Sequence, residues 1–259
     1  MKNRINHLFK KKKENILSIY FTAGFPQLND TIEIIQQLEK NGVDLIEIGI
    51  PFSDPTADGP VIQKSSEAAL NNGMSLNLLF EQLKTIRKSV KIPLILMGYF
   101  NPVFQFGVEQ FCQKCAEIGI DGTILPDMPL NEFESEYKAI FAKHNLHNIL
   151  LITPQTSVER IKQIDAASEG FIYMVSSSAT TGAGKTVADF QTDYFEKIQT
   201  MRLKNPTIIG FGISNKATFK NACKYANGAI IGSAFVKAIQ SETSLEKGVL
   251  EFVEGILLE

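Results

Sequence analysis

Short apolar runs alternate with amphipathic segments along the whole chain, and this alternation is the feature that most limits the possible fold. The apolar runs are rich in Ile, Leu and Val and end at turn residues, as buried parallel strands do. The segments between them carry apolar residues at helical spacing. We expect eight strands, within residues 17–24, 43–50, 93–99, 121–125, 149–154, 170–176, 207–211 and 228–231.

A strict alternation of strands and helices predicts an α/β fold in which helices cover a parallel sheet. The chain has 259 residues, its connections are short, and no linker divides it. Eight strand–helix units at this length favour a closed (β/α)8 TIM barrel, a single domain spanning residues 1–259. Extra helices are expected within residues 1–14, 233–240 and 244–257. An open, doubly wound sheet of six or seven strands is the alternative.

Charge and hydrophobicity exclude several classes of partner. Hydrophobic residues make up 44% of the chain, charged residues make up 21%, and the net charge is −2. A chain this close to neutrality has no electrostatic reason to bind nucleic acid or an anionic membrane surface. No apolar run is long enough to cross a membrane, and the N-terminus is charged rather than signal-like, so we expect a cytoplasmic protein.

The cysteines and histidines do not form a metal-binding pattern. Cys112 and Cys115 have C-x-x-C spacing, but they lie in a helical pattern and no second pair accompanies them. The three histidines are His7, His144 and His147, and none falls at an expected strand end. We therefore expect no metal site and no Ser-His-Asp triad.

One charged residue interrupts the second strand. Side chains alternate along a strand, so Ile46, Ile48 and Ile50 share one face while Glu47 and Gly49 share the other. If helices cover the isoleucine face, Glu47 points into the opposite interior. A carboxylate there is costly unless it is paired, hydrogen-bonded or neutral, which makes Glu47 a candidate acid or base.

The loop after this strand carries two aspartates. Asp58 and Glu47 would form an acid/base pair if both faced one pocket at the carboxyl end of the barrel. Alternatively, Asp58 caps the helix that Pro60 opens, and Asp54 only closes a Ser-Asp-Pro turn. Phe52, a large apolar side chain on the same loop, either folds back onto the barrel mouth or meets a partner.

Three late turns are rich in glycine. They lie within residues 180–184, 210–214 and 231–233, after the sixth, seventh and eighth strands. Glycine lets backbone N–H groups approach a phosphate, and a helix starting at Ser233 would direct its N-terminal dipole there. The alternative is that these are ordinary tight turns. The long polar stretch within 176–189 is expected to move as a lid.

With these residues in place, the chain resembles the alpha subunit of tryptophan synthase over nearly its whole length. The run Glu47–Pro60, with its Pro-Phe-Ser-Asp-Pro and Asp-Gly-Pro segments, is close to the signature of that family. Supporting matches lie at residues 22–24, 97–102, 127–129, 181–182 and 210–214. The resemblance implies a retro-aldol cleavage of indole-3-glycerol phosphate to indole and glyceraldehyde 3-phosphate. It also implies a beta subunit with pyridoxal phosphate that receives the indole.

The resemblance also implies roles for individual residues. Glu47 would protonate indole C3 and handle the proton of the side-chain hydroxyl. Asp58, expected near water and ionised, would accept the indole N–H and stabilise positive charge on the ring. The remaining matches are Tyr20, Tyr99, Ile152, Tyr173 and Phe211 at the indole, Thr181, Gly182, Gly212, Gly232 and Ser233 at the phosphate end, and Pro51 and Asp54 facing the partner.

By the same resemblance we expect an α2β2 complex with tryptophan synthase beta subunits, a small phosphate ester as substrate, and no cofactor in this chain. The sixth loop departs from the family pattern, since Ala179 replaces a glycine and Ser177 stands where some relatives carry arginine. The alanine at position 179 predicts a stiffer lid hinge. The alternatives are a sugar-phosphate isomerase or epimerase, and a subunit that only serves a partner allosterically. Glu47 and Asp58 argue against the second.

Overall fold

A closed barrel of eight parallel strands forms the centre of the molecule, in the order β1 to β8, with β8 pairing back onto β1. The computed structural model describes residues 3–176, 187–241 and 244–258. The closed barrel confirms the TIM fold over the open sheet. The strands are β1 Ile16–Thr22, β2 Leu45–Gly49, β3 Leu94–Met97, β4 Gly122–Ile124, β5 His147–Ile152, β6 Ile172–Val175, β7 Thr207–Gly210 and β8 Gly228–Ile231.

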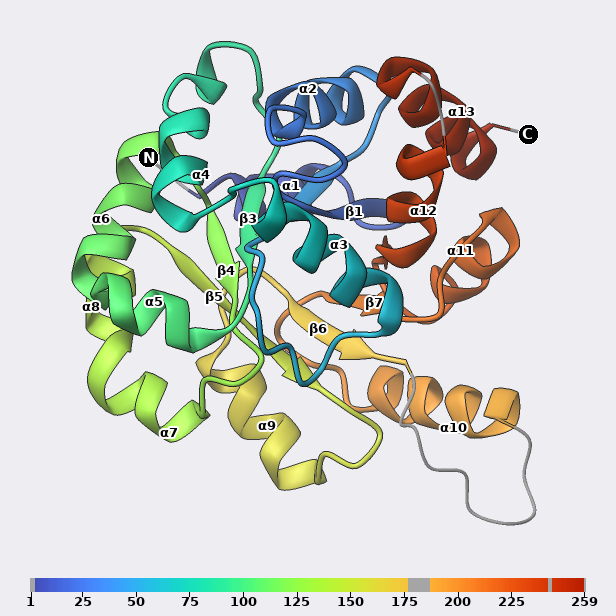
Figure 1. Cartoon of the computed structure of the whole chain (residues 1–259). Helices are drawn as coiled ribbons and strands as arrows, with labels where there is room; N and C mark the ends of the chain where they lie inside the picture. Colours follow the sequence, from blue (N-terminus) through green and yellow to red (C-terminus); the bar gives the residue numbers. More distant parts are fainter. Residues whose placement is uncertain (1–2, 177–186, 242–243, 259) are drawn as a thin grey trace.

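Helices surround the barrel, and the last helix, α13, packs against α2 near the start of the chain, while α12 packs against α13 and α3 (Figure 1). Within the described ranges, no helix has the length and apolar character that crossing a membrane requires. The helices are α1 Arg4–Lys11, α2 Thr31–Lys40, α3 Pro60–Asn71, α4 Leu76–Leu83, α5 Phe100–Phe106, α6 Val108–Ile118, α7 Leu130–Glu132, α8 Lys138–Lys143, α9 Val158–Ala167, α10 Val187–Thr200, α11 Lys216–Ala222, α12 Ser233–Ser241 and α13 Leu245–Leu257, with short 3-10 and π turns at Ile86–Lys88 and Phe133–Tyr137.

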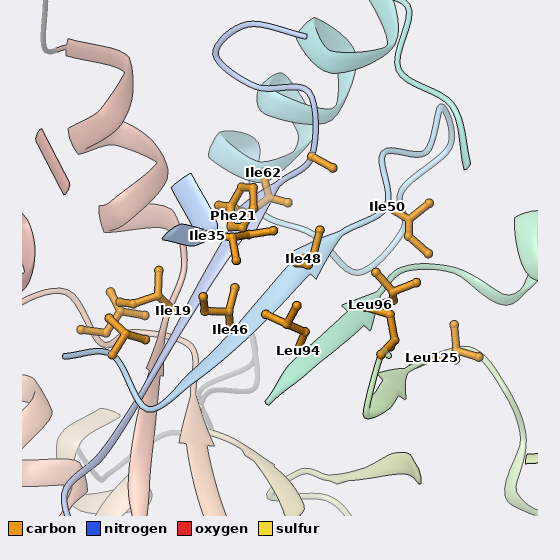
Figure 2. Packing of buried hydrophobic residues seen from close by; sticks show 14 of the residues in the cluster. Ile19, Phe21, Ile35, Ile46, Ile48, Ile50, Ile62, Leu94, Leu96 and Leu125 are labelled. Atoms are coloured by element: carbon orange, nitrogen blue, oxygen red, sulfur yellow. The ribbon is translucent and has the colours of Figure 1, made fainter. Parts of the chain in front are cut away.

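The main hydrophobic core lies between the outside of the barrel and the helices. Ile46 and Ile48 of β2 point outward toward Ile35 of α2 and Ile62 of α3 (Figure 2). All four side chains are buried, and burial of such apolar surface is the main favourable term in folding. The isoleucine face of β2 is therefore the helix-facing one, as the alternation predicts.

Helix α1 closes the amino-terminal end of the barrel. Its Ile5 and Phe9 are buried against interior side chains that include Leu45 and Phe171. The rings of Phe9 and Phe171 lie 5.7 Å apart between centroids. This end is filled with apolar side chains, which leaves the carboxyl-terminal end for a site.

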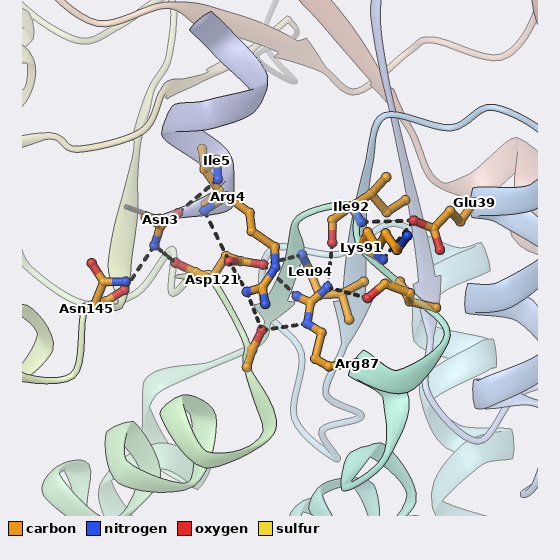
Figure 3. Close-up of polar contacts among 12 residues, drawn as sticks. Asn3, Arg4, Ile5, Glu39, Arg87, Lys91, Ile92, Leu94, Asp121 and Asn145 are labelled. Atoms are coloured by element: carbon orange, nitrogen blue, oxygen red, sulfur yellow. Dashed lines mark hydrogen bonds and ion pairs between the residues drawn. The ribbon is translucent and has the colours of Figure 1, made fainter. Parts of the chain in front are cut away.

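A buried aspartate ties α1 to the barrel at the same end (Figure 3). Asp121, just before β4, pairs through Oδ1 with Arg4 at 3.0 Å and through Oδ2 with Arg87 at 2.6 Å. The same Oδ2 accepts the N–H of Leu94 at 3.0 Å. Because both carboxylate oxygens are satisfied, this charge is compensated despite its burial.

Candidate active site

Two adjoining cavities open at the carboxyl-terminal end of the barrel. The first, here the glycine-side cavity, has a volume of about 410 Å³ and contains Glu47 with residues of the late glycine turns. The second, the loop-side cavity, has a volume of about 620 Å³ and lies against the loops that follow β2 and β3. Five residues line both: Tyr20, Asp58, Gly59, Met97 and Phe211.

Strand β2 carries Glu47 into the barrel interior, because its neighbours Ile46 and Ile48 face the helices. The side chain is fully buried. Ser18 Oγ donates a hydrogen bond of 2.9 Å to Glu47 Oε1, whereas Oε2 has no hydrogen-bond partner among the described residues. Burial raises the pKa of Glu47 to about 8, and the bond from Ser18 acts in the opposite direction. At neutral pH this carboxyl group is therefore mostly protonated.

Asp58 does not cap the helix that follows it. The N-cap of α3 is Gly59, and no side chain caps this helix. Instead, Tyr99 Oη donates a hydrogen bond of 3.0 Å to Asp58 Oδ2 and accepts the N–H of Ala57 at 2.8 Å. Asp58 is half-buried, so it is more enclosed than the expected water-exposed loop carboxylate. Burial raises its pKa, and the bond from Tyr99 opposes this rise.

Phe52 of the same loop also contacts Tyr99. The ring of Phe52 lies 5.1 Å from the ring of Tyr99, so Phe52 folds back onto the barrel mouth. Pro51 is buried, and Asp54 is exposed. Ser53 Oγ donates to the Asp54 carboxylate, which matches the turn-closing alternative for this aspartate.

Two tyrosines fill the top of the barrel because two glycines leave room for them. A Cβ atom added at Gly49 would lie 2.2 Å from Tyr20 Oη, and one at Gly210 would lie 2.0 Å from Tyr173 Oη. Both tyrosines line the glycine-side cavity. Burial raises the pKa of each phenol well above its ordinary value, so both remain neutral at physiological pH.

Residues from the turns after β7 and β8 line the other side of the glycine-side cavity. Gly212, Gly232 and Ser233 all contribute, as the sequence predicts. Lys237 of α12 lines the same cavity, and sequence reasoning missed it. The signal was available, since Lys237 follows Ser233 by one helical turn and so shares its face of the helix. Among the described residues, no ion pair engages Lys237.

Phe211 occupies a strained position between the two cavities. Its φ of 68° lies in the left-handed region, which costs a bulky residue about 1–3 kcal/mol. Two contacts hold it there: the Ser176 hydroxyl donates to its carbonyl oxygen, and its ring meets the edge of the Tyr173 ring, with 6.2 Å between centroids. Such strain is typical of functional sites.

Ile152 is a site residue that the structure places elsewhere. It is fully buried on the helix-facing side of β5 and lines neither of the two cavities. Its chain neighbours Leu151 and Thr153 line the loop-side cavity instead. The reason is the alternation of side chains along a strand, which sends adjacent residues to opposite faces.

The sixth loop falls outside the described part of the chain. Thr181, Gly182 and the two departures at Ser177 and Ala179 all lie there. The predictions for these residues and for the lid remain predictions.

The cysteines and one histidine lie away from both cavities. Cys112 and Cys115 are buried in α6, and burial raises the pKa of the Cys112 thiol to about 12. His147 is the first residue of β5, which begins two residues earlier than expected, so His147 lies at the opposite end of the barrel from the site. In the described ranges, no group of three or more His, Cys, Asp or Glu side chains is arranged to hold a metal ion.

Comparison with known proteins identifies the family. A family model described as tryptophan synthase alpha chain matches residues 7–255. The tryptophan synthase alpha chain of Flavobacterium johnsoniae is 63% identical over 254 residues, which cover 98% of this chain and 99% of the relative. The chain belongs to the tryptophan synthase alpha chain family. Its members perform the alpha reaction of tryptophan biosynthesis, the cleavage of indole-3-glycerol phosphate to indole and glyceraldehyde 3-phosphate.

Solved structures of tryptophan synthase agree with this assignment. The alpha chain from Legionella pneumophila subsp. pneumophila superposes with a TM-score of 0.87 at 31% identity, covering 99% of this chain and 96% of that one. A chain of the tryptophan synthase complex from Pyrococcus furiosus superposes with a TM-score of 0.85 at 32% identity. The match covers 95% of this chain and 99% of that one. The chain is a carbon–carbon lyase of this family, which excludes the sugar-phosphate isomerase or epimerase.

Proposed function

We propose that Glu47 is the general acid and base of the cleavage and that Asp58 binds the indole N–H. The observation that supports this assignment is the placement of a fully buried Glu47 and a half-buried Asp58 around one cavity. The unpartnered Oε2 of Glu47 leaves one carboxyl oxygen free for substrate. Two carboxyl groups in such different environments suit an acid and an anion at the same pH.

The steps follow from these two groups. Glu47 donates its proton to indole C3, which makes the ring cationic. Asp58, as a carboxylate, accepts the indole N–H and stabilises this charge. The Glu47 carboxylate then takes the proton of the side-chain hydroxyl, the bond between C3 and the glycerol carbon breaks, and its electrons restore the neutral indole. Indole and the aldehyde leave, and Glu47 is again protonated.

The walls of the cavities suit the two ends of the substrate. We assign the neutral rings of Tyr20, Tyr173 and Phe211 to the indole, because flat apolar surfaces bury an aromatic ligand well. We assign the phosphate end of the substrate to Gly212 and the start of α12. Ser233 is the first residue of this nine-residue helix, and the helix dipole favours an anion there. Lys237 adds a positive charge one turn along this helix.

A beta-type subunit is the proposed partner. The tryptophan synthase of Pyrococcus furiosus is described as a complex, and this chain resembles one of its chains over almost its full length. On this chain, Phe104 of α5 is 55% exposed although it is large and apolar, and α5 begins directly after Tyr99. Exposed Asp54 belongs to the neighbouring loop. We propose that Phe104 and Asp54 face the partner in an α2β2 assembly, whereas Pro51, which the resemblance also assigned to this face, is buried.

The remaining parts of the proposal concern the chain as a whole. We propose that residues 1–259 act as one domain that holds no cofactor, and that pyridoxal phosphate resides in the beta subunit. The residues around the cavities supply acid, base, anion and phosphate-binding groups, which is all that a retro-aldol cleavage requires.

Indole release from indole-3-glycerol phosphate tests the two carboxyl groups. Glu47→Gln and Asp58→Asn each keep size and polarity, so both variants should fold and lose about 10²–10⁴-fold in kcat. Glu67→Gln, on the exposed side of α3, is the matched control and should retain parent activity. Activity of either site variant within a few-fold of the parent would remove that residue from the mechanism.

Titrating a beta-type subunit into the assay and measuring binding with Phe104→Lys tests the partner surface.

A further inference from the structure

Ser18 contacts the proposed acid from the strand beside it. It lies two residues before Tyr20 on β1, so both side chains face the barrel interior. In the parallel ladder, Tyr20 is level with Glu47 and Ser18 is level with Leu45, one layer nearer the amino-terminal end. Ser18 is fully buried, and its Oγ donates to Glu47 Oε1 at 2.9 Å.

We propose that Ser18 is a positioning residue that determines which carboxyl oxygen of Glu47 carries the catalytic proton. A protonated carboxyl group has one hydroxyl oxygen and one carbonyl-type oxygen, and a donor such as Ser18 favours the latter as its acceptor. Because Oε1 accepts the hydrogen bond from Ser18, the proton resides on Oε2, which has no partner among the described residues. This inference rests on the proposed role of Glu47.

The surroundings of Ser18 favour this role over that of an ordinary core residue. Its neighbours in the ladder are Leu45 and Ile230, and both belong to the apolar cluster inside the barrel. A hydroxyl in such a layer is costly unless it is hydrogen-bonded. The bond that satisfies Ser18 is the one to Glu47, so the serine and the acid depend on each other.

The titration of Glu47 can be distinguished from that of the other titratable groups around it. Tyr20 on β1 and Tyr173 on β6 interact electrostatically with Glu47, but burial keeps both phenols neutral across the working pH range. Asp58, in the loop after β2, must be ionised to bind the indole N–H, so it governs the acid limb of the pH profile. Lys237 of α12 lines the same cavity, on the side of the turn after β8. The alkaline limb therefore reports on Glu47.

The test is the pH dependence of kcat for Ser18→Ala. The Ser18 hydroxyl stabilises ionised Glu47, so its loss should move the alkaline limb upward by about one pH unit. The plateau of kcat should fall roughly tenfold because the proton is no longer fixed on one oxygen, while KM stays within about twofold. Ser18→Thr restores the hydroxyl and should recover the parent profile. Thr123→Val, which removes a buried hydroxyl bond to Asn148, is the matched control and should leave the profile unchanged.

A double variant separates this inference from the proposed function. If Ser18 acts through Glu47, adding Ser18→Ala to Glu47→Gln should change kcat no further, whereas a purely structural role predicts an additional loss. An inactive Glu47→Gln beside a Ser18→Ala variant with unshifted profile and near-parent kcat overturns only the role of Ser18. A Glu47→Gln variant with parent activity overturns the proposed function and this role with it. Carbon NMR titration of the Glu47 carboxyl in parent and Ser18→Ala gives the same pKa comparison without an activity assay.

Discussion

Tyr99 donates a hydrogen bond of 3.0 Å to Asp58 across the gap between two loops of the barrel. The same hydroxyl accepts the N–H of Ala57 at 2.8 Å, and the Tyr99 ring lies against Phe52. Tyr99, which follows β3, thus contacts the loop after β2 at three residues: Asp58, Ala57 and Phe52. The position of the carboxylate in the cavity is set by a side chain that sequence matching assigned only to lining the indole.

Tyr99→Phe should therefore affect Asp58 more than it affects substrate packing. The hydroxyl stabilises the ionised carboxylate, so its loss should raise the pKa of Asp58 and move the acid limb of kcat/KM to higher pH. We expect a loss of roughly tenfold in kcat/KM at neutral pH, as for one hydrogen bond to a charged group. Tyr225→Phe, whose ring packs on Phe195 and lines neither cavity, is the control. An acid limb that stays in place would mean that the hydroxyl does not tune Asp58.

The barrel and its acid could be predicted because their signals are periodic. Eight repeats of strand and helix leave few alternatives, and the polar interruption at Glu47 fixes which face of β2 looks inward. The fifth strand has no such interruption. Its Ile149–Ile152 run is apolar on both faces, as buried parallel strands often are, so the sequence does not reveal which residue faces the cavity. The resemblance predicts Ile152 at the indole, whereas the structure places its side chain on the helix-facing side of β5.

The sequence pattern cannot supply contacts between segments that are far apart in the chain. Ser18 meets Glu47, and Tyr99 meets Asp58, across sequence separations of 29 and 41 residues. The first contact depends on the stagger of β1 and β2, and the second depends on the path of the loops after β2 and β3; periodicity encodes neither. Lys237, in contrast, is within reach of sequence reasoning, because its spacing of one turn from Ser233 places it on the same face of α12.

The close fit of Tyr20 over Gly49 gives a second prediction. In Gly49→Ala the new Cβ would meet Oη at 2.2 Å and the ring carbon bearing it at 2.6 Å, so the enclosed ring must move. We expect a destabilisation of about 1–3 kcal/mol, typical of overpacking, and at least a tenfold loss of kcat. Gly255→Ala in α13 meets nothing within 4 Å, so by helix propensity it should stabilise the protein by about 0.5–1 kcal/mol. Urea unfolding of both variants checks the opposite signs.

Lys237→Gln tests the charge beside the glycine turns. Removing the cation should raise KM for indole-3-glycerol phosphate about tenfold and leave kcat within twofold, because the lysine acts on binding at the phosphate rather than on the indole. The KM of the parent should also rise with salt more steeply than that of the variant. Lys220→Gln on exposed α11 is the matched control. Equal changes in the two variants would point to a general effect of net charge.

Asp121→Asn should weaken the fold without touching the chemistry. The variant breaks the pairs with Arg4 and Arg87 at the amino-terminal end of the barrel, and losing one partner of a buried pair costs about 3–5 kcal/mol. We expect urea unfolding to show a loss of this order, reduced where Arg4 is exposed to water. Glu81→Gln removes an exposed pair with Lys84 and should cost less than about 1 kcal/mol. A kcat well below that of the parent under native conditions would show that the network also supports the site.

His147 makes the stability of the protein depend on pH. Its ring is 7% exposed, Nδ1 lies 3.0 Å from Glu169, and Nε2 is buried without a partner among the described residues. Burial lowers the pKa of His147, although Glu169 acts in the opposite direction. The native state therefore favours the neutral ring, whereas the unfolded chain binds a proton at the ordinary pKa of about 6.5.

The stability that this histidine contributes is consequently complete above pH of about 6.5 and is lost as the pH falls below that value. His147→Gln cannot titrate, so its free energy of unfolding should fall less steeply between pH 7 and pH 5 than that of the parent, by up to about 1.4 kcal/mol per pH unit. His7→Gln, on the exposed side of α1, is the control and should follow the parent curve. Urea unfolding at several pH values measures all three curves. Parallel curves for parent and His147→Gln would show that protonation of this ring does not govern the acid sensitivity of the fold. The buried Nε2 would then be expected to bond to a water molecule.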